Sequence, residues 1–152
     1  MNLFVLDKSP MKAAEYHCDK HVPKMILETA QMLCTARHHW GLDAPYKPAY
    51  ENHPCTRWVR ETSDNYRWAW VLGFWLGKQY EQRFGKTHKS SDVIMKVMKH
   101  SARMPKGLTP FAQAMPDVYK QDDAVDAYRS YYIGEKAYFA KWDRSVEPDW
   151  WA

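Results

Sequence analysis

The chain of 152 residues has the length of one domain, and its hydrophobic and charged fractions of 45% and 26% exclude a disordered protein. Its net charge of +4 permits a nucleic-acid partner, although it is smaller than the clustered excess typical of a nonspecific DNA-binding protein. No apolar run approaches the roughly 20 residues that cross a bilayer, no signal peptide is predicted, and three cysteines without a pairing motif favour a reduced, cytoplasmic, soluble protein.

The sequence predicts an all-α fold: a single compact domain, residues 1–152, of about five helices behind a short extended N-terminal segment. This segment covers residues 1–7 and is too short to predict a β-sheet. Ser9 and Pro10 then supply an N-cap and a first-turn proline, which predict a helix over residues 11–20.

A second helix is predicted to run to about Trp40, where Gly41 ends it. Pro23 forms either a kink or the first turn of this helix. A loop with two prolines follows, and Pro54 begins the next helical stretch.

The longest helix is predicted to end at Gly85 and to be capped by Ser63 or Asp64. Apolar residues cover nearly all of its sides, which is typical of a buried central helix. Those that define the predicted face are Tyr66, Trp70, Val71, Leu72, Phe74, Trp75, Leu76 and Gly77.

A shorter helix is predicted from Val93 to about Ala102, with Ser91 and Asp92 as its cap. Residues 103–120 contain three prolines and a glycine, so we expect an ordered loop, and long ordered loops often carry function.

A last helix, capped by Asp122 or Asp123, is predicted to reach about Ala140, and an aromatic tail follows it. The chain has 8 Trp, 10 Tyr and 5 Phe. These rings form either an aromatic core or a surface on which bases stack.

Four polar residues near the N-terminus are separated by four, three and four positions: His17, His21, Lys24 and Glu28. On an uninterrupted helix this spacing places all four side chains on one stripe. A helix break at Pro23 would rotate the first pair against the second.

This cluster has three interpretations. In the first, the histidines and the glutamate pair with one another on a solvated face. In the second, His17 and His21 bind a metal ion, with Glu28 or Cys18 as the third ligand. In the third, Glu28 is a carboxylate whose pKa is set by partial burial, and it moves protons with a histidine or an amine nearby.

Two motifs favour the third interpretation. Cys18-Asp19-Lys20-His21 contains an Asp-x-His element, and Glu28 follows it after six residues. Near the other end, tyrosines run into a Gly-x-Lys-Ala sequence in the segment Tyr128-Arg129-Ser130-Tyr131-Tyr132-Ile133-Gly134-Glu135-Lys136-Ala137-Tyr138. Together these motifs resemble the phage pyrimidine-dimer DNA glycosylase family of the endonuclease V type.

The resemblance implies an all-α enzyme of DNA repair, a DNA glycosylase with abasic-site lyase activity that uses neither a metal nor a cofactor. In this family the N-terminal amine attacks C1′ of the damaged nucleotide and forms a Schiff base. Glu28 would be the carboxylate that stabilises charge on the sugar and moves protons, and His21 and Asp19 would order the site. Tyr131, Tyr132 and Lys136 would contact the substrate.

The chain also departs from the family pattern. Asn2 follows Met1, and a residue of this size usually leaves the initiator methionine in place, so the amine belongs to Met1, to Asn2 or, by replacement, to Lys24. Leu27 and Gln31 stand where the family has phosphate-binding arginines. The substrate therefore stays open between a damaged or modified pyrimidine in DNA and a nucleotide.

Further substrate contacts are expected from His17, from His53 and Arg57 at the start of the Pro54 helix, and from Gln113 in the long loop. A plain helix cap is the alternative for His53. We expect Glu28 to lie partly buried at the floor of a cleft, within a few ångströms of His21 and the N-terminal segment.

Two other functions fit the sequence. One is a non-catalytic module that binds a nucleotide or nucleic acid through aromatic residues, and the other is a glycosidase or transferase acting on a nucleotide. In each case the expected partner is DNA or a nucleotide and not a membrane.

Overall fold

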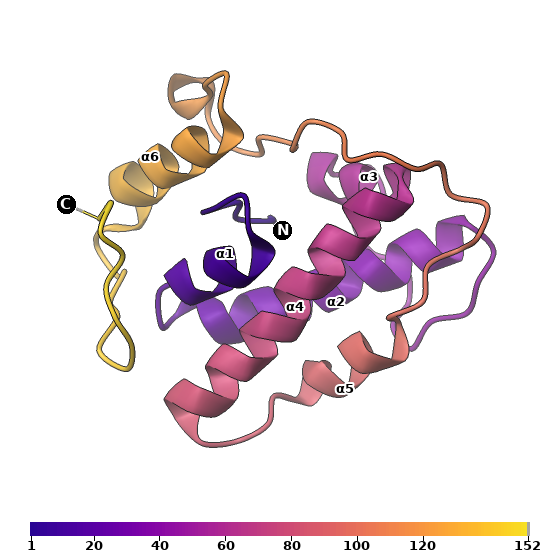
Figure 1. The fold of residues 1–152 in the computed structure, drawn as a ribbon, viewed down its shortest axis with the longest axis horizontal. Helices are drawn as coiled ribbons and strands as arrows, with labels where there is room; N and C mark the ends of the chain where they lie inside the picture. Colours follow the sequence, from indigo (N-terminus) through magenta and orange to yellow (C-terminus); the bar gives the residue numbers. More distant parts are fainter. Residues whose placement is uncertain (152) are drawn as a thin grey trace.

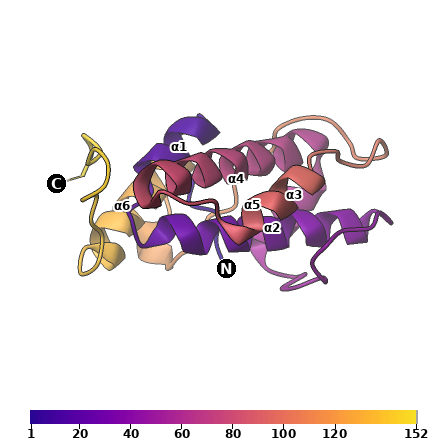
Figure 2. The same cartoon turned by 90° about the horizontal axis from the view of Figure 1, so that it is seen from below.

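The computed structural model describes residues 1–151, which form six α-helices and one short 3-10 helix and contain no β-strand. The long helix α4 (Ser63–Phe84) crosses in front of α2 (His21–His39) in Figure 1, and Figure 2 shows the two helices at different depths of the molecule. The predicted all-α fold is confirmed. None of the helices in the described residues has the length and apolar character needed to span a bilayer.

Helix α4 packs closely on its neighbours because two of its residues are glycines. A Cβ atom on Gly73 would lie 2.8 Å from Ile94 Cδ1 and 3.1 Å from Thr29 Cγ2, so this glycine brings α4 against both α2 and α5 (Lys89–Lys96). The core also holds large buried side chains of α4, including Tyr66, Leu72 and Leu76.

Several helix boundaries follow the local signals in the sequence. The Ser9 side chain accepts a hydrogen bond from the Lys12 amide at the start of α1 (Pro10–Tyr16). Gly85 ends α4 in the left-handed conformation with φ of 71°. At the start of α6 (Ala124–Lys136), Asp123 accepts from the amides of Val125 and Asp126.

Other boundaries were predicted wrongly. The first helix ends at Tyr16 rather than near residue 20, because buried Arg83 binds the carbonyl oxygens of Glu15 and His17 as the chain turns. The second helix begins at His21, with Pro23 in its first turn, so His17 is not on the same helix as Glu28. The predicted four-residue stripe is therefore broken before Pro23.

Two caps also differ from the prediction. Helix α4 is capped by the Thr62 hydroxyl, while Asp64 accepts from the Gly107 amide in the long loop instead. Helix α5 covers residues 89–96 rather than 93–102, because the His88 imidazole accepts from the Ser90 amide and starts the helix earlier.

The last helix ends at Lys136 rather than near Ala140. Before it, the segment 97–116 crosses one side of the molecule and ends at the 3-10 helix η1 (Asp117–Tyr119) (Figure 1). This loop is held at α3 (Pro54–Glu61), where Trp58 Nε1 donates to the Thr109 carbonyl oxygen at 3.3 Å.

The N-terminal segment lies between α6 and the α2–α4 pair (Figure 1). Its apolar residues Leu3, Phe4, Val5 and Leu6 are all buried. Arg129 of α6 donates to the Leu6 carbonyl oxygen at 2.9 Å and pairs with Asp7 at 3.1 Å. The start of the chain is therefore part of the core, and this positions Met1 beside α2.

Candidate functional site

The Glu28 carboxylate meets the start of the chain. Its Oε1 atom lies 3.1 Å from the α-amine of Met1 and accepts a hydrogen bond of 3.0 Å from the amide of Asn2. Glu28 is only 9% exposed. A buried carboxylate is costly unless charged or polar partners satisfy it, and here the N-terminal amine and amide are those partners.

The main chain of Met1 is partly exposed although its side chain is anchored. The Met1 side chain is 2% exposed and packs against the core, while the residue as a whole is only half-buried. Its exposed surface therefore belongs to the main chain, which includes the amine. The site thus combines a primary amine, on a partly exposed main chain, with a nearly buried carboxylate.

Asn2 anchors this arrangement with its side chain, which is also buried. The Nδ2 atom donates to the Ala114 carbonyl oxygen at 2.9 Å, and Oδ1 accepts from the Leu3 amide at 2.7 Å. Tyr128 and Cys55 also lie at Oδ1, at 3.2 and 3.5 Å. Sequence reasoning gave no role to either residue. Tyr128 lies one helical turn before Tyr132 on α6, and that spacing is the signal that could have found it.

His53 stands at the edge of the amine–carboxylate pair. Its Nδ1 atom accepts from the Cys55 amide at 3.1 Å and caps α3, so the proton of the neutral ring is on Nε2. Burial and then the positive charge of the N-terminus lower its pKa, and the charge of Glu28 opposes them. His53 is therefore both a helix cap and a neighbour of the candidate site.

His21 contacts the opposite side of the N-terminal segment. Its ring stacks on Phe4 at 4.7 Å, and its Nδ1 atom lies 2.6 Å from the Tyr132 hydroxyl. Burial, followed by nearby positive charges of which His17 is the largest, lowers the pKa of His21 to about 2. The ring is therefore neutral at physiological pH and acts on the N-terminal segment through packing.

Asp19 and His17 lie away from the amine. Asp19 pairs with Arg83 at 3.2 Å and accepts from the Asp143 amide at 2.9 Å, which ties the C-terminal tail to α4. His17 is fully buried, its Nδ1 atom lies 2.6 Å from the Ala13 carbonyl oxygen, and burial lowers its pKa to about 4. In this conformation neither side chain is placed to touch a substrate at Glu28.

Three predicted residues form an exposed edge near His21. Lys24 is exposed, Lys136 is half-buried, and the charges of both lower the pKa of His21. Lys136 lies 4.9 Å above the ring of half-buried Tyr131, which in turn stacks on Phe4 at 6.2 Å. This edge therefore presents a cation–aromatic pair next to the N-terminal segment.

The remaining predicted contacts are spread over the molecule. Tyr132 is fully buried and bonds His21. Arg57 is exposed and donates to Asn52 at 3.4 Å. Gln113 uses both ends of its amide on the Gln121 main chain, at 2.7 and 3.1 Å. Its amide is thus already paired within the loop.

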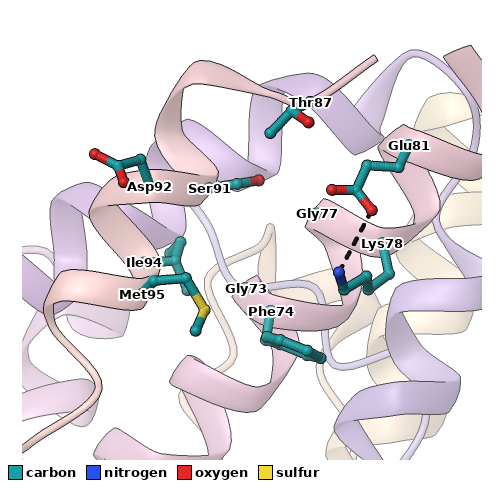
Figure 3. A pocket seen from close by; sticks show the side chains of 10 residues that line it. All are labelled: Gly73, Phe74, Gly77, Lys78, Glu81, Thr87, Ser91, Asp92, Ile94 and Met95. Carbon is teal, nitrogen blue, oxygen red and sulfur yellow. Dashed lines mark hydrogen bonds and ion pairs between the residues drawn. The ribbon is translucent and has the colours of Figure 1, made fainter. Parts of the chain in front are cut away.

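A separate cavity of about 250 Å³ lies between α4 and α5 (Figure 3). Gly73 and Gly77 line it with Phe74, Ile94 and Met95, and the exposed Lys78–Glu81 ion pair of 3.4 Å stands at its side (Figure 3). It contains no residue of the Glu28 site. In residues 1–151 no three His, Cys, Asp or Glu side chains come together in a way that could hold a metal ion.

The chain was compared with protein-family models, with curated proteins and with solved structures, and none of the three comparisons gives a match. Its function therefore has to be argued from the geometry at Glu28.

Proposed function

We propose that this protein is a DNA glycosylase with abasic-site lyase activity, acting on a damaged or modified pyrimidine through its N-terminal amine and Glu28. The observation that carries the proposal is the 3.1 Å contact between the Met1 α-amine and Glu28 Oε1. A primary amine attacks a carbon centre in its neutral form, and the neighbouring carboxylate can take up the proton that it must lose.

In the proposed reaction, the neutral amine nitrogen forms a bond to C1′ of the nucleotide while the bond from C1′ to the base breaks. The base leaves with the electron pair and takes up a proton. The bond from C1′ to O4′ then breaks, O4′ takes up a proton, and a Schiff base remains. A base, Glu28 in this proposal, accepts the C2′ proton, and the bond to the 3′ phosphate breaks with its electron pair on the departing phosphate. In this proposal Glu28, whose Oε1 atom lies 3.1 Å from the amine, accepts the proton of the amine and stabilises positive charge on the sugar.

Removal of Met1 would not dismantle this site. The Asn2 nitrogen already lies 3.0 Å from the same Oε1 atom that pairs with the Met1 amine. A chain starting at either residue therefore presents an α-amine to Glu28. This is why we assign the nucleophile to the N-terminus rather than to the exposed side chain of Lys24.

The surroundings suit a nucleic-acid substrate. Lys24 and Lys136 supply positive charge near the N-terminal segment, and Tyr131 supplies a half-exposed ring on which a displaced base can stack. The alternatives are a non-catalytic nucleic-acid or nucleotide binder and a glycosidase or transferase acting on a free nucleotide.

Borohydride reduction in the presence of abasic-site DNA tests the proposal, because it converts a Schiff base into a stable covalent adduct. We expect adduct formation near pH 7, with the adduct on the N-terminal peptide by mass spectrometry. Glu28→Gln should slow adduct formation by about 10²–10⁴-fold while DNA binding persists. The matched control is Glu61→Gln, which changes an exposed acid on α3.

Each other outcome points to a different function. Binding of DNA without any adduct would overturn the enzyme proposal in favour of a binding module. Release of a base from free nucleotides, with no adduct on DNA, would favour the nucleotide-directed enzyme. An adduct on Lys24 would retain the chemistry and reject the N-terminal nucleophile.

A further inference from the structure

We propose that Asn2 is a positioning residue, whose side-chain amide fixes the start of the chain so that the terminal amine faces Glu28. This inference rests on the proposed function, since positioning matters only if the amine reacts. How firmly the start of the chain is held can be measured separately, through the chemical reactivity of the α-amine.

The Asn2 amide joins three separate parts of the fold to the N-terminus. The Ala114 carbonyl oxygen belongs to the long loop, Cys55 to α3 and Tyr128 to α6. Both ends of the amide are used, because Nδ2 donates to Ala114 while Oδ1 accepts from the Leu3 amide at 2.7 Å. A buried amide satisfied in this way defines one orientation of the main chain on either side of it.

Tyr128 connects this anchor to the loop. Its hydroxyl accepts from the Ala114 amide at 3.2 Å, and it lies 2.6 Å from the Ala112 carbonyl oxygen and 3.2 Å from Asn2 Oδ1. A hydroxyl has one hydrogen to donate, and Tyr128 donates it mainly to the Ala112 carbonyl oxygen, because that contact is the shorter one. Tyr128 thus holds the loop residue that in turn accepts from Asn2.

Glu28 alone does not fix the amine. A single carboxylate oxygen receives both the Met1 amine and the Asn2 amide, and an ion pair of this kind permits rotation about the terminal bonds. The Asn2 side chain, anchored one residue further along, removes that freedom. Since a misplacement of about 1 Å can cost about 10²-fold in rate, this anchor sets the efficiency of the amine.

The test uses Asn2→Leu, which keeps the side-chain size and removes every side-chain hydrogen bond, and Tyr128→Phe, which removes only the hydroxyl. Tyr66→Phe is the matched control, because it removes a buried hydroxyl that bonds Val97 on another part of the fold. Intact masses first establish that all variants start at the same residue. Chemical unfolding shows which of them remain folded.

Two rates are then measured for each folded variant. For Asn2→Leu we expect the trapping rate with abasic-site DNA to fall about 10- to 100-fold while DNA affinity stays unchanged. We expect the reaction of the α-amine with formaldehyde and cyanoborohydride, compared with exposed Lys12 in the same molecule, to rise because the amine is released. Tyr128→Phe should shift both rates in the same directions by a smaller factor, and Tyr66→Phe neither.

Unchanged rates in both Asn2→Leu and Tyr128→Phe would overturn the inference. If Asn2→Leu does not fold, the two rates of Tyr128→Phe test the inference, and unchanged rates in that variant would overturn it. If the wild-type protein forms no adduct while the formaldehyde rates still change as expected, the anchor is supported and the proposed function fails.

Discussion

Two acidic residues near the N-terminus, Asp19 and Glu28, lie nine positions apart and have different surroundings. Asp19 is bound by the guanidinium of Arg83 and by the Asp143 amide, so both of its oxygens hold parts of the fold together. Within residues 1–151, the polar partners of Glu28 are the Met1 amine and the Asn2 amide, both at Oε1. The partners of Asp19 are therefore parts of the fold, whereas the partner of Glu28 is a potential nucleophile.

This comparison separates two kinds of polar cluster that look alike in sequence. Around Asp19, the polar contacts join the turn after α1 to α4 and to the C-terminal tail. Around Glu28, the contacts hold the α-amine and the first amide of the chain. Changes in the first region should therefore act on stability, and changes in the second on reactivity.

The largest expected effect is that of Arg83→Met. The Arg83 side chain is fully buried and binds Asp19 and the carbonyl oxygens of Glu15 and His17, so its removal leaves an unpaired acid and two unsatisfied carbonyls. We expect the free energy of unfolding to fall by about 3–5 kcal/mol in urea titrations. The protein that remains folded should trap abasic-site DNA at the wild-type rate.

Lys78→Met is the control for this substitution, because it breaks an exposed ion pair with Glu81. It should change the free energy of unfolding by less than about 0.5 kcal/mol. An Arg83→Met protein as stable as this control would contradict the structural role of the Asp19 region.

The next effect is a loss of stability in mild acid. Burial lowers the pKa of His17 to about 4 and that of His21 to about 2, from 6.5 in both cases, so the unfolded chain binds more protons than the folded one below pH 6.5. Stability is therefore complete above pH 6.5 and is lost as the pH falls toward these values. Each histidine contributes a slope that approaches about 1.4 kcal/mol per pH unit well below pH 6.5, so the two together lose roughly 2 kcal/mol between pH 6 and pH 5.

Urea unfolding at pH 7, 6 and 5 measures this loss. His39→Gln, which changes an exposed histidine at the end of α2, should leave the pH dependence as it is. His21→Gln should reduce the slope. A free energy of unfolding that is constant from pH 7 to pH 5 would show that the two histidines are protonated in the folded protein.

The smallest expected effect is that of Lys24→Gln on DNA binding. Lys24 is exposed one turn before Glu28, so its loss should leave unfolding unchanged within about 0.5 kcal/mol. If it contacts one phosphate, the slope of log affinity against log salt should decrease by about 0.9. Lys96→Gln on α5 is the matched control, and equal slopes for the two variants would place the DNA elsewhere.

Local signals in the sequence were enough for much of the fold. Ser9, Gly85 and Asp123 end or start helices where predicted, because a cap depends on a few neighbouring residues. The end of the first helix was wrong because it depends on Arg83, more than sixty positions away. No periodicity within residues 11–20 contains that information.

Only part of the candidate site could be predicted from the sequence. The apolar N-terminal segment and the acid at position 28 indicated that the two meet, and they do at 3.1 Å. The stripe that was expected to add His17 does not exist, since α2 begins only at His21. The anchor at Asn2 was missed because its partners lie up to 126 positions away.

The long sequence separation between Asn2 and its partners has a consequence for folding during synthesis on the ribosome. The residues at the start of the chain emerge first, yet the Ala114 and Tyr128 partners of Asn2 are made 112 and 126 residues later. Until then the apolar stretch from Leu3 to Leu6 lacks α6 as a cover, and such a stretch is prone to aggregate or to bind a chaperone. A nascent chain that stops before α6 carries both the amine and the carboxylate without a fixed start, so the proposed centre forms only after α6 has been made.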